Sequence, residues 1–343
     1  MPRLMNARDE ALTIFSVAGA RVEALKLAAY VLPFEKPVVE LVARVRELRA
    51  LVHTDAKLEH ELKRLEEKTG RLAREIFATL TPWQKVQLSR HPNRPYTLDY
   101  VEQLFTDFQE LHGDRRFGED AAIVGGLARY RGRSVVIVGH QKGRSTKEKV
   151  ARNFGQAQPE GNRKACRLYD LANRFGLPVF TFIDTPGAYP GIGAEERGQS
   201  EAIGACLAAM SRAKVPIIAT IIGEGGSGGA LALGVANRVH VLEYGTYSVI
   251  SPEGCASILW KDGAKADEAA MRMRMTAPDL LQLGVVERII DEPAGGAHQD
   301  GKLAASNVDQ ALAEALSELL QMTPDELVED RYRRFRAIGA YLA

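Results

Sequence analysis

Residues 223–232 have the sequence GEGGSGGALA, and three kinds of chemistry fit its residue types and spacing. The first is dinucleotide binding, because Gly223, Gly225 and Gly228 match the pattern G-x-G-x-x-G, and Glu243 lies where an acid would bind a ribose hydroxyl. This interpretation is weak, because no long α/β continuation follows Glu243 to complete a dinucleotide site.

The second is nucleophilic catalysis, because Ser227 is the centre of the pattern G-x-S-x-G, a strand-to-helix turn that exposes a nucleophile in many hydrolases. Such an enzyme needs an acid and a histidine further along the chain, and His298 with Asp279 or Asp291 could supply them. His298, however, lies in AGGAHQD with no strand before it, and most other histidines are predicted to be surface or structural residues. A serine hydrolase is therefore weakly supported.

The third is stabilisation of an oxyanion by the main chain. Helix N-termini carry unpaired N–H groups, and small residues let a ligand carbonyl approach them. A strand, a glycine loop and a helix follow one another twice, at FTFIDTPGAYPGIG and at IIATIIGEGGSGG. Two such loops at the ends of adjacent parallel strands would each offer a donor, from Gly187–Ala188 and from Gly228–Gly229. The alternative is that the glycines serve only close packing, but two such loops in series favour the oxyanion interpretation.

The surrounding segments predict an α/β fold, because successive strands separated by helices require parallel crossovers. Apolar residues about 3.5 positions apart predict a charged helical hairpin over 37–76, and Thr81 is predicted to cap a short helix. HPNRPYTLDY predicts an extended linker, AIVGGLARY and SVVIVGHQKG predict a β-hairpin, and KGRSTKEK predicts a basic loop. Two further helices are predicted to end the chain, the last capped by Thr323.

The composition argues against several classes of protein. The chain has 343 residues and a formal net charge of +1, so binding of nucleic acid is not implied. No apolar run reaches the ~18 residues of a membrane span, and Asp9 and Glu10 argue against a signal peptide at ALTIFSVAGA. Cys166, Cys206 and Cys255 are far apart, which fits a reducing compartment and argues against a zinc knot. We therefore expect a cytoplasmic protein without a metal site.

Several blocks of the sequence resemble one family closely. They are IVGG, GHQKGR, RNFGQAQPEGNRKA, FTFIDTPGAYPG, GAEERGQSEAI, GEGGSGGALA, TYSVISPEGCASILWK and EPAGGAH. Together they resemble the α subunit of the carboxyltransferase of multi-subunit, bacterial or plastid-type acetyl-CoA carboxylase, from about Phe34 to near Ile290. The resemblance implies a crotonase-like (ClpP/crotonase) fold of ββα turns wound as a superhelix. We accordingly predict an extension of uncertain order (1–32), an N-terminal helical hairpin and linker (33–120), a crotonase-like carboxyltransferase core (121–292) and C-terminal helices (293–343).

The resemblance also implies substrates and partners. The substrates are acetyl-CoA and carboxybiotin on the biotin carboxyl carrier protein, and the product is malonyl-CoA, in the first committed step of fatty acid synthesis. The implied partner is a β subunit in an α2β2 heterotetramer, with biotin carboxylase in the full complex. Zinc is expected on the β subunit only, so this chain is expected to hold no metal and no covalently bound cofactor.

In that family the biotin ureido anion itself takes the proton from the acetyl methyl group, so no titrating base is needed. The resemblance places the biotin-side oxyanion hole at Gly228 and Gly229, beside the loop of Gly187 and Ala188, and the thioester-side hole on the β subunit. It also makes five residues candidates for substrate binding, namely Ser227, Glu224, Ala230, Lys142 and Arg144.

Other charged residues admit two interpretations. Lys142, Arg144 and Lys149 are candidates to meet CoA phosphates or the carrier protein, or they form a solvated basic loop. Glu195, Glu196 and Arg197 open a helix, where acids also offset the helix dipole, and Cys255 is expected to be a packing residue.

Two other functions remain open. One is a stand-alone crotonase-fold hydratase, isomerase or thioesterase, which would have little use for the long N-terminal hairpin. The other is a non-catalytic scaffold or regulatory subunit, which would not need the second glycine loop.

Overall fold

The β-branched and glycine-rich segments form one eight-stranded sheet. The computed structural model describes residues 30–51 and 56–339, and most of the predicted 1–32 extension lies outside them. The strands are β1 (Thr106–Glu110), β2 (Ile123–Tyr130), β3 (Arg133–His140), β4 (Val179–Thr185), β5 (Ile217–Gly226), β6 (Arg238–Leu242), β7 (Thr246–Ser248) and β8 (Arg288–Ile290).

The strand order is β1-β2-β3-β4-β5-β6-β8, with β7 pairing on β5. β1, β2 and β3 are antiparallel, and the pairs from β3 to β8 are parallel. The predicted β-hairpin and α/β core are therefore present. β1 pairs with β2, so the sheet begins at Thr106, earlier than residue 121, where we placed the start of the core.

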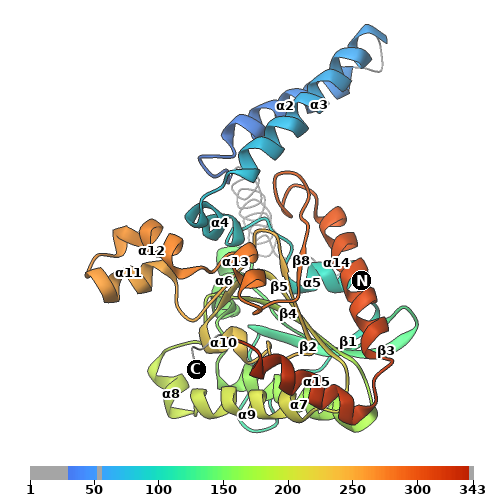
Figure 1. Ribbon diagram of the computed structural model, residues 1–343, viewed down its shortest axis with the longest axis vertical. Helices are drawn as coiled ribbons and strands as arrows, with labels where there is room; N and C mark the ends of the chain where they lie inside the picture. The colour runs from blue at the N-terminus through green and yellow to red at the C-terminus, as the bar shows by residue number, and fades with distance from the viewer. Residues whose placement is uncertain (1–29, 52–55, 340–343) are drawn as a thin grey trace, which may run out of the picture.

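Helices cover both faces of the sheet and extend from it (Figure 1). Those of the first half are α2 (Lys36–Leu51), α3 (Ala56–Ala78), α4 (Pro82–Ser89), α5 (Thr97–Leu104), α6 (Thr146–Ala151), α7 (Pro159–Phe175), α8 (Ile192–Glu196) and α9 (Gln199–Arg212). Those of the second half are α10 (Ser227–Leu231), α11 (Pro252–Trp260), α12 (Ala266–Met273), α13 (Ala277–Gln282), α14 (Gly301–Leu319) and α15 (Pro324–Arg336). Among the described helices, none is long and apolar enough to cross a membrane.

Two apolar clusters fill the molecule, one on each face of the sheet. Leu168 of α7 and Met210 of α9 pack in the first with Ile217 of β5. Tyr100 of α5 and Leu312 of α14 pack in the second, which also contains residues of β3 and β4. Because both faces are covered, β4 and β5 are buried along their whole length, which explains their continuous apolar runs.

The α2–α3 hairpin projects away from the sheet (Figure 1). Its two helices contact one another along their length, as the apolar spacing predicted. A third, smaller cluster holds its base, where Leu32 and Phe77 pack against Leu88 and Tyr244.

The two predicted caps, at Thr81 and Thr323, are present, and other helix ends follow similar local rules. Thr81, Ser251 and Thr323 accept hydrogen bonds from the first turns of α4, α11 and α15, and Gly176 ends α7 with φ 67°. Two segments differ from prediction. The second half of the predicted linker HPNRPYTLDY enters helix α5, and the predicted loop KGRSTKEK contains α6, which Ser145 and Glu148 cap reciprocally.

Candidate functional site

The two glycine loops lie side by side at the carboxyl ends of β4 and β5. These strands are parallel neighbours, and the last pair in their register joins Thr185 to Gly225. Carboxyl ends of adjacent parallel strands are where α/β proteins bind ligands. The arrangement predicted for two loops in series is therefore the one the fold adopts.

The stretch GEGG proved to be strand rather than loop. β5 runs through Gly226, and its last three residues pair with β7. The glycines serve close approach here, since a Cβ on Gly226 would lie 2.2 Å from the carbonyl oxygen of Pro186 in the neighbouring loop. The chain then turns sharply, with Ser227 at φ 54°, into the five-residue helix α10.

The two loops touch at Gly229. A Cβ on this residue would lie 2.6 Å from the Ala188 nitrogen and 2.7 Å from the Gly187 carbonyl carbon. A Cβ on the preceding Gly228 would instead make ordinary contact with Ile203, at 3.4 Å. Glycine is thus required sterically at position 229, whereas the space at position 228 admits a Cβ.

The backbone donors of the two loops are not equivalent. The N–H of Gly187 donates to Thr185 Oγ1 at 3.1 Å, so it is already paired. Within the described chain, the N–H of Ala188 has no such hydrogen bond. Gly228 and Gly229 lie in the first turn of α10, where N–H groups have no partner inside the helix. If the loops bind an oxyanion, Ala188, Gly228 and Gly229 are the residues that can donate.

A cleft of about 760 Å³ opens over these loops. Its walls come from both loops, β5 and the start of α11, and include Gly187, Ala188, Glu224, Ser227, Gly228 and Glu253. Ala230, predicted to bind substrate, is instead fully buried in the core beneath the cleft.

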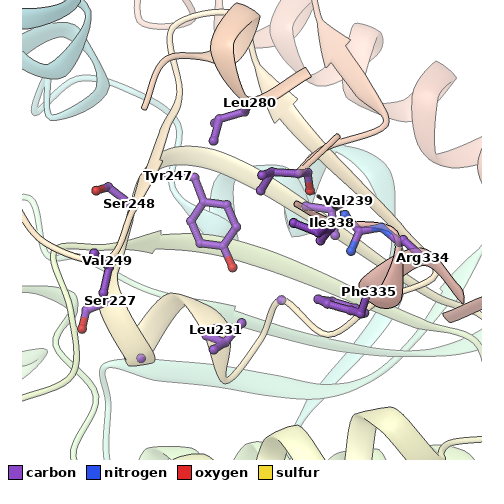
Figure 2. A pocket seen from close by; sticks show the side chains of 13 residues that line it. Ser227, Leu231, Val239, Tyr247, Ser248, Val249, Leu280, Arg334, Phe335 and Ile338 are labelled. Atoms are coloured by element: carbon purple, nitrogen blue, oxygen red, sulfur yellow. Dashed lines mark hydrogen bonds between the residues drawn. The ribbon is translucent and has the colours of Figure 1, made fainter. Parts of the chain in front are cut away.

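A second, apolar cavity of about 360 Å³ adjoins the cleft and shares Ser227 and Gly228 with it. Figure 2 shows Tyr247 reaching across this cavity with its hydroxyl directed toward α10. Arg334 at the far side donates to Glu287 and to the Val285 carbonyl, so its charge is already paired. The cavity is therefore an apolar extension of the site.

A buried ion pair supports both loops from below. Lys142 Nζ lies 2.6 Å from Asp184 Oδ1 at the end of β4, and the same oxygen accepts the Glu224 N–H of β5 at 3.0 Å. Burial opposes the charge of Lys142, but the Asp184 and Glu224 carboxylates together outweigh burial and raise the pKa of Lys142. Asp184 thus ties the ends of β4 and β5 together, and Lys142 neutralises its charge. The Lys142 side chain is only 16% exposed rather than part of a solvated loop.

The other predicted residues do not line the cleft. Arg144 donates to Asp99 and lies over the Tyr96 ring, and Lys149 is half-buried on α6. Glu195 and Glu196 are exposed on α8, whereas Arg197 pairs with Glu160 of α7. Cys255 is half-buried on α11.

Sequence analysis missed Arg90, which follows α4 and enters the cleft. Its Nε donates to Glu224 Oε1 at 2.8 Å, and its Nη1 donates to Glu253 Oε1 at 2.6 Å. It therefore bridges β5 and α11 across the cleft. Nothing local distinguishes this arginine, because its partners lie 134 and 163 residues away in the chain.

The catalytic groups of a serine hydrolase are not assembled around Ser227. His298 binds Glu35 at 2.7 Å and stacks on His91 with ring centroids 3.9 Å apart. Asp279 accepts from Thr276, and among the described residues the carboxylate that pairs with His298 is Glu35 rather than Asp279 or Asp291. Ser227 does have the positive φ of a nucleophile turn, but no histidine of the described residues hydrogen-bonds to it.

Glu243 does not behave as a ribose ligand. Its Oε2 accepts the N–H of Glu292 at 3.1 Å, in the loop after β8. Burial raises the pKa of its carboxyl group, as expected for a structural acid beside other carboxylates. The dinucleotide interpretation is therefore not supported.

The sheet with successive strand–loop–helix units places the chain in the crotonase-like class. Its fold is similar to that of transcarboxylase 12S with methylmalonyl-coenzyme A and methylmalonic acid bound (TM-score 0.55, 22% identity, 66% of this chain and 42% of that chain). It is also similar to a Pseudomonas malonate decarboxylase hetero-tetramer in complex with coenzyme A (TM-score 0.53, 20% identity, 65% and 89% of the two chains).

The sequence comparisons identify the family more specifically than the fold comparisons do. Residues 31–339 match the family described as acetyl co-enzyme A carboxylase carboxyltransferase-like. The acetyl-coenzyme A carboxylase carboxyl transferase subunit alpha of Sorangium cellulosum is 70% identical over 316 residues, covering 92% of this chain and all of the relative. The corresponding subunit of an Azoarcus species is 58% identical, covering 90% of this chain and 98% of the relative. The chain belongs to this family of biotin-dependent carboxyltransferase α subunits, and the stand-alone crotonase-fold alternative is not favoured.

Proposed function

We propose that this chain transfers a carboxyl group from carboxybiotin, carried on the biotin carrier protein, to acetyl-CoA, and that its two glycine loops hold the biotin ureido oxygen. The N–H groups of Ala188, Gly228 and Gly229 are the proposed donors. The observation that carries the proposal is the contact between the loops at Gly229, since it fixes the first turn of α10 beside Ala188. Preorganised N–H groups stabilise developing negative charge without reorganising during the reaction.

The proposed chemistry asks for such groups rather than for a base. Breaking the bond between the carboxyl carbon and the ureido nitrogen releases CO2 and leaves the electron pair on biotin as an anion. That anion takes a proton from the acetyl methyl group, and the resulting enolate attacks CO2 to give malonyl-CoA. Arg90, Glu224 and Glu253 in the cleft are paired with one another, so they shape the site rather than accept this proton. Glu224 and Ser227 are the proposed side-chain contacts to biotin.

The partner proposed for the open side of the cleft is a zinc-bearing β subunit, in an α2β2 assembly that also works with biotin carboxylase. The relatives are named as alpha subunits, so the family functions within a multi-subunit enzyme. Large apolar side chains flank the cleft, with Ile192 80% exposed and Val249 79% exposed, as expected of a surface that a partner covers. We further propose the cytoplasm as its location, in line with three free cysteines.

The test is malonyl-CoA-dependent carboxylation of free biotin, which is the reverse reaction, by the purified chain with and without a zinc-binding β partner. We expect activity only when both chains are present. Full activity of this chain alone would rule out the two-subunit proposal. Hydration of an enoyl-CoA or hydrolysis of an acyl-CoA by the chain alone would support the stand-alone alternative.

A further inference from the structure

A buried polar cluster joins the base of the N-terminal hairpin to the core. Glu35, which is 1% exposed, lies just before α2, His91 follows α4, and His298 lies in the loop between β8 and α14. Figure 1 shows that loop beside the base of the hairpin. We call these three residues the latch.

The Glu35 carboxylate is held from several sides. Its Oε1 lies 2.7 Å from His298 Nε2, and its Oε2 accepts the Leu32 N–H at 2.8 Å. The Nε2 of His91 faces Oε2 from 3.8 Å and makes no hydrogen bond of ordinary length within the described chain. A buried carboxylate is stable only when such donors surround it. The latch is therefore a built arrangement rather than an accidental contact.

The latch geometry favours hydrogen bonding over metal binding, although the ligand atoms of its three residues lie within 4.8 Å of one another. The N–H of Asn93 points at His91 Nδ1, 3.2 Å away, so that nitrogen accepts and the neutral ring carries its proton on Nε2. A metal at Nε2 would require that nitrogen to be deprotonated and would normally leave Nδ1 as a donor. Nε2 instead faces Glu35 Oε2 from 3.8 Å, and that carboxylate is already bonded to His298 and to the Leu32 N–H.

One tight turn connects the latch to the cleft. The N–H groups of both Arg90 and His91 donate to the Leu88 carbonyl at the end of α4, and the Arg94 N–H donates to the His91 carbonyl. Buried Arg94 anchors this turn to β5 through the Ile222 carbonyl and to the loop of His298 through Glu292. His91 lies in the latch, and its neighbour Arg90 lies in the cleft.

We propose that Glu35 and His298 are positioning residues that act through His91 to hold Arg90 between Glu224 and Glu253. By this route the base of the hairpin sets the position of Glu224, three residues before the start of α10. The inference rests on the proposed function, because it takes the cleft over Gly228 and Gly229 as the site of carboxyl transfer.

The test is a double-mutant cycle on kcat in the complex with the partner subunit, using Glu35→Gln, Arg90→Gln and both together. We expect each single substitution to lower kcat about tenfold, and the double variant to lie within about twofold of Arg90→Gln alone, because coupled residues are not additive. The matched control is Glu40→Gln, the same chemical change at an exposed position on α2, and it should leave kcat and the melting temperature unchanged. All rates are taken well below the melting temperature of each variant.

Three outcomes would overturn the proposal. The first is a kcat for Glu35→Gln equal to that of the control, and the second is a double variant whose losses multiply, which is the result for two independent structural defects. The third is a measured zinc content of one equivalent in the purified chain that is lost in the Glu35→Gln variant, because this result would make the cluster a metal site. Gly229→Ala is assayed in parallel to keep the two proposals apart. Full activity of Gly229→Ala refutes the proposed function. If Gly229→Ala loses activity but the losses of Glu35→Gln and Arg90→Gln multiply in the double variant, only the role of the latch is refuted.

Discussion

Replacing Gly229 by alanine tests whether the contact between the two loops is catalytic. The added Cβ would lie 2.6 Å from the Ala188 nitrogen, so the loops must separate by about 0.8 Å to reach an ordinary contact of 3.4 Å. Backbone donors must be held within about 0.5 Å of their productive position. Losing one oxyanion donor costs on the order of 10²- to 10³-fold in kcat. We expect a loss of that size for Gly229→Ala.

Gly228→Ala is the matched control because it adds the same methyl group one residue earlier. Its Cβ would meet only the Ile203 side chain, at 3.4 Å, and the substitution keeps the N–H. We expect the kcat of this variant to stay within about threefold of the unmodified chain, since a contact of that length needs little adjustment. Comparing the two variants therefore distinguishes the effect of moving the N–H groups from the effect of replacing a glycine.

The assay is biotin carboxylation by the complex, with kcat and KM for malonyl-CoA measured separately and assembly checked by size-exclusion chromatography. We expect kcat to fall while KM changes little, because the proposed donors act on biotin and on its developing charge. Near-normal kcat in Gly229→Ala, or equal losses in the two variants, would refute the oxyanion role of these loops.

Three further outcomes are expected. Lys142→Met should cost about 3–5 kcal/mol in urea unfolding, because it leaves the Asp184 carboxylate buried without its cation; a cost under about 1 kcal/mol would show that the pair is not structural. Ser227→Ala should keep at least about half of the carboxyl-transfer rate, whereas a nucleophile would lose several orders of magnitude. Unfolding free energy should be greatest above about pH 7 and decrease as the pH falls from 6.5 toward 4, by up to ~1.4 kcal/mol per pH unit for each depressed histidine. Burial lowers the pKa of His91 to about 4 and of His140 to about 3, so the unfolded chain binds protons that the folded chain excludes; constant stability over that range would contradict this assignment.

Features with local physical causes could be predicted from the sequence. Thr81, Ser251 and Thr323 cap helices because a side-chain oxygen reaches an N–H two or three residues later in any fold. Continuous apolar runs gave β4 and β5, and the apolar spacing gave α2 and α3. The motif blocks indicated the family, which the comparisons confirmed.

Features that depend on distant partners could not be predicted. Gly223–Gly226 looked like a loop because isolated glycines disfavour strands, yet pairing with β7 and the close approach of Pro186 extend β5 through them. Lys142 was open to two interpretations, a substrate-binding cation or part of a solvated loop, until the fold placed Asp184 beside it, forty-two residues away in the chain. Pairings between such distant residues leave no periodic pattern in the sequence from which they could be predicted.

The sequence by itself therefore determined the repeated strand–loop–helix units of the core, the N-terminal hairpin, several helix caps, the family and the presence of two glycine loops. Only the tertiary structure decided which N–H groups of those loops remain free, that Arg90 bridges the cleft, and that His298 binds Glu35 rather than serving Ser227. The physical reason is the distance along the chain over which each effect acts. Periodicity and capping act over a few residues, whereas burial and charge pairing join residues that only the folded chain brings together.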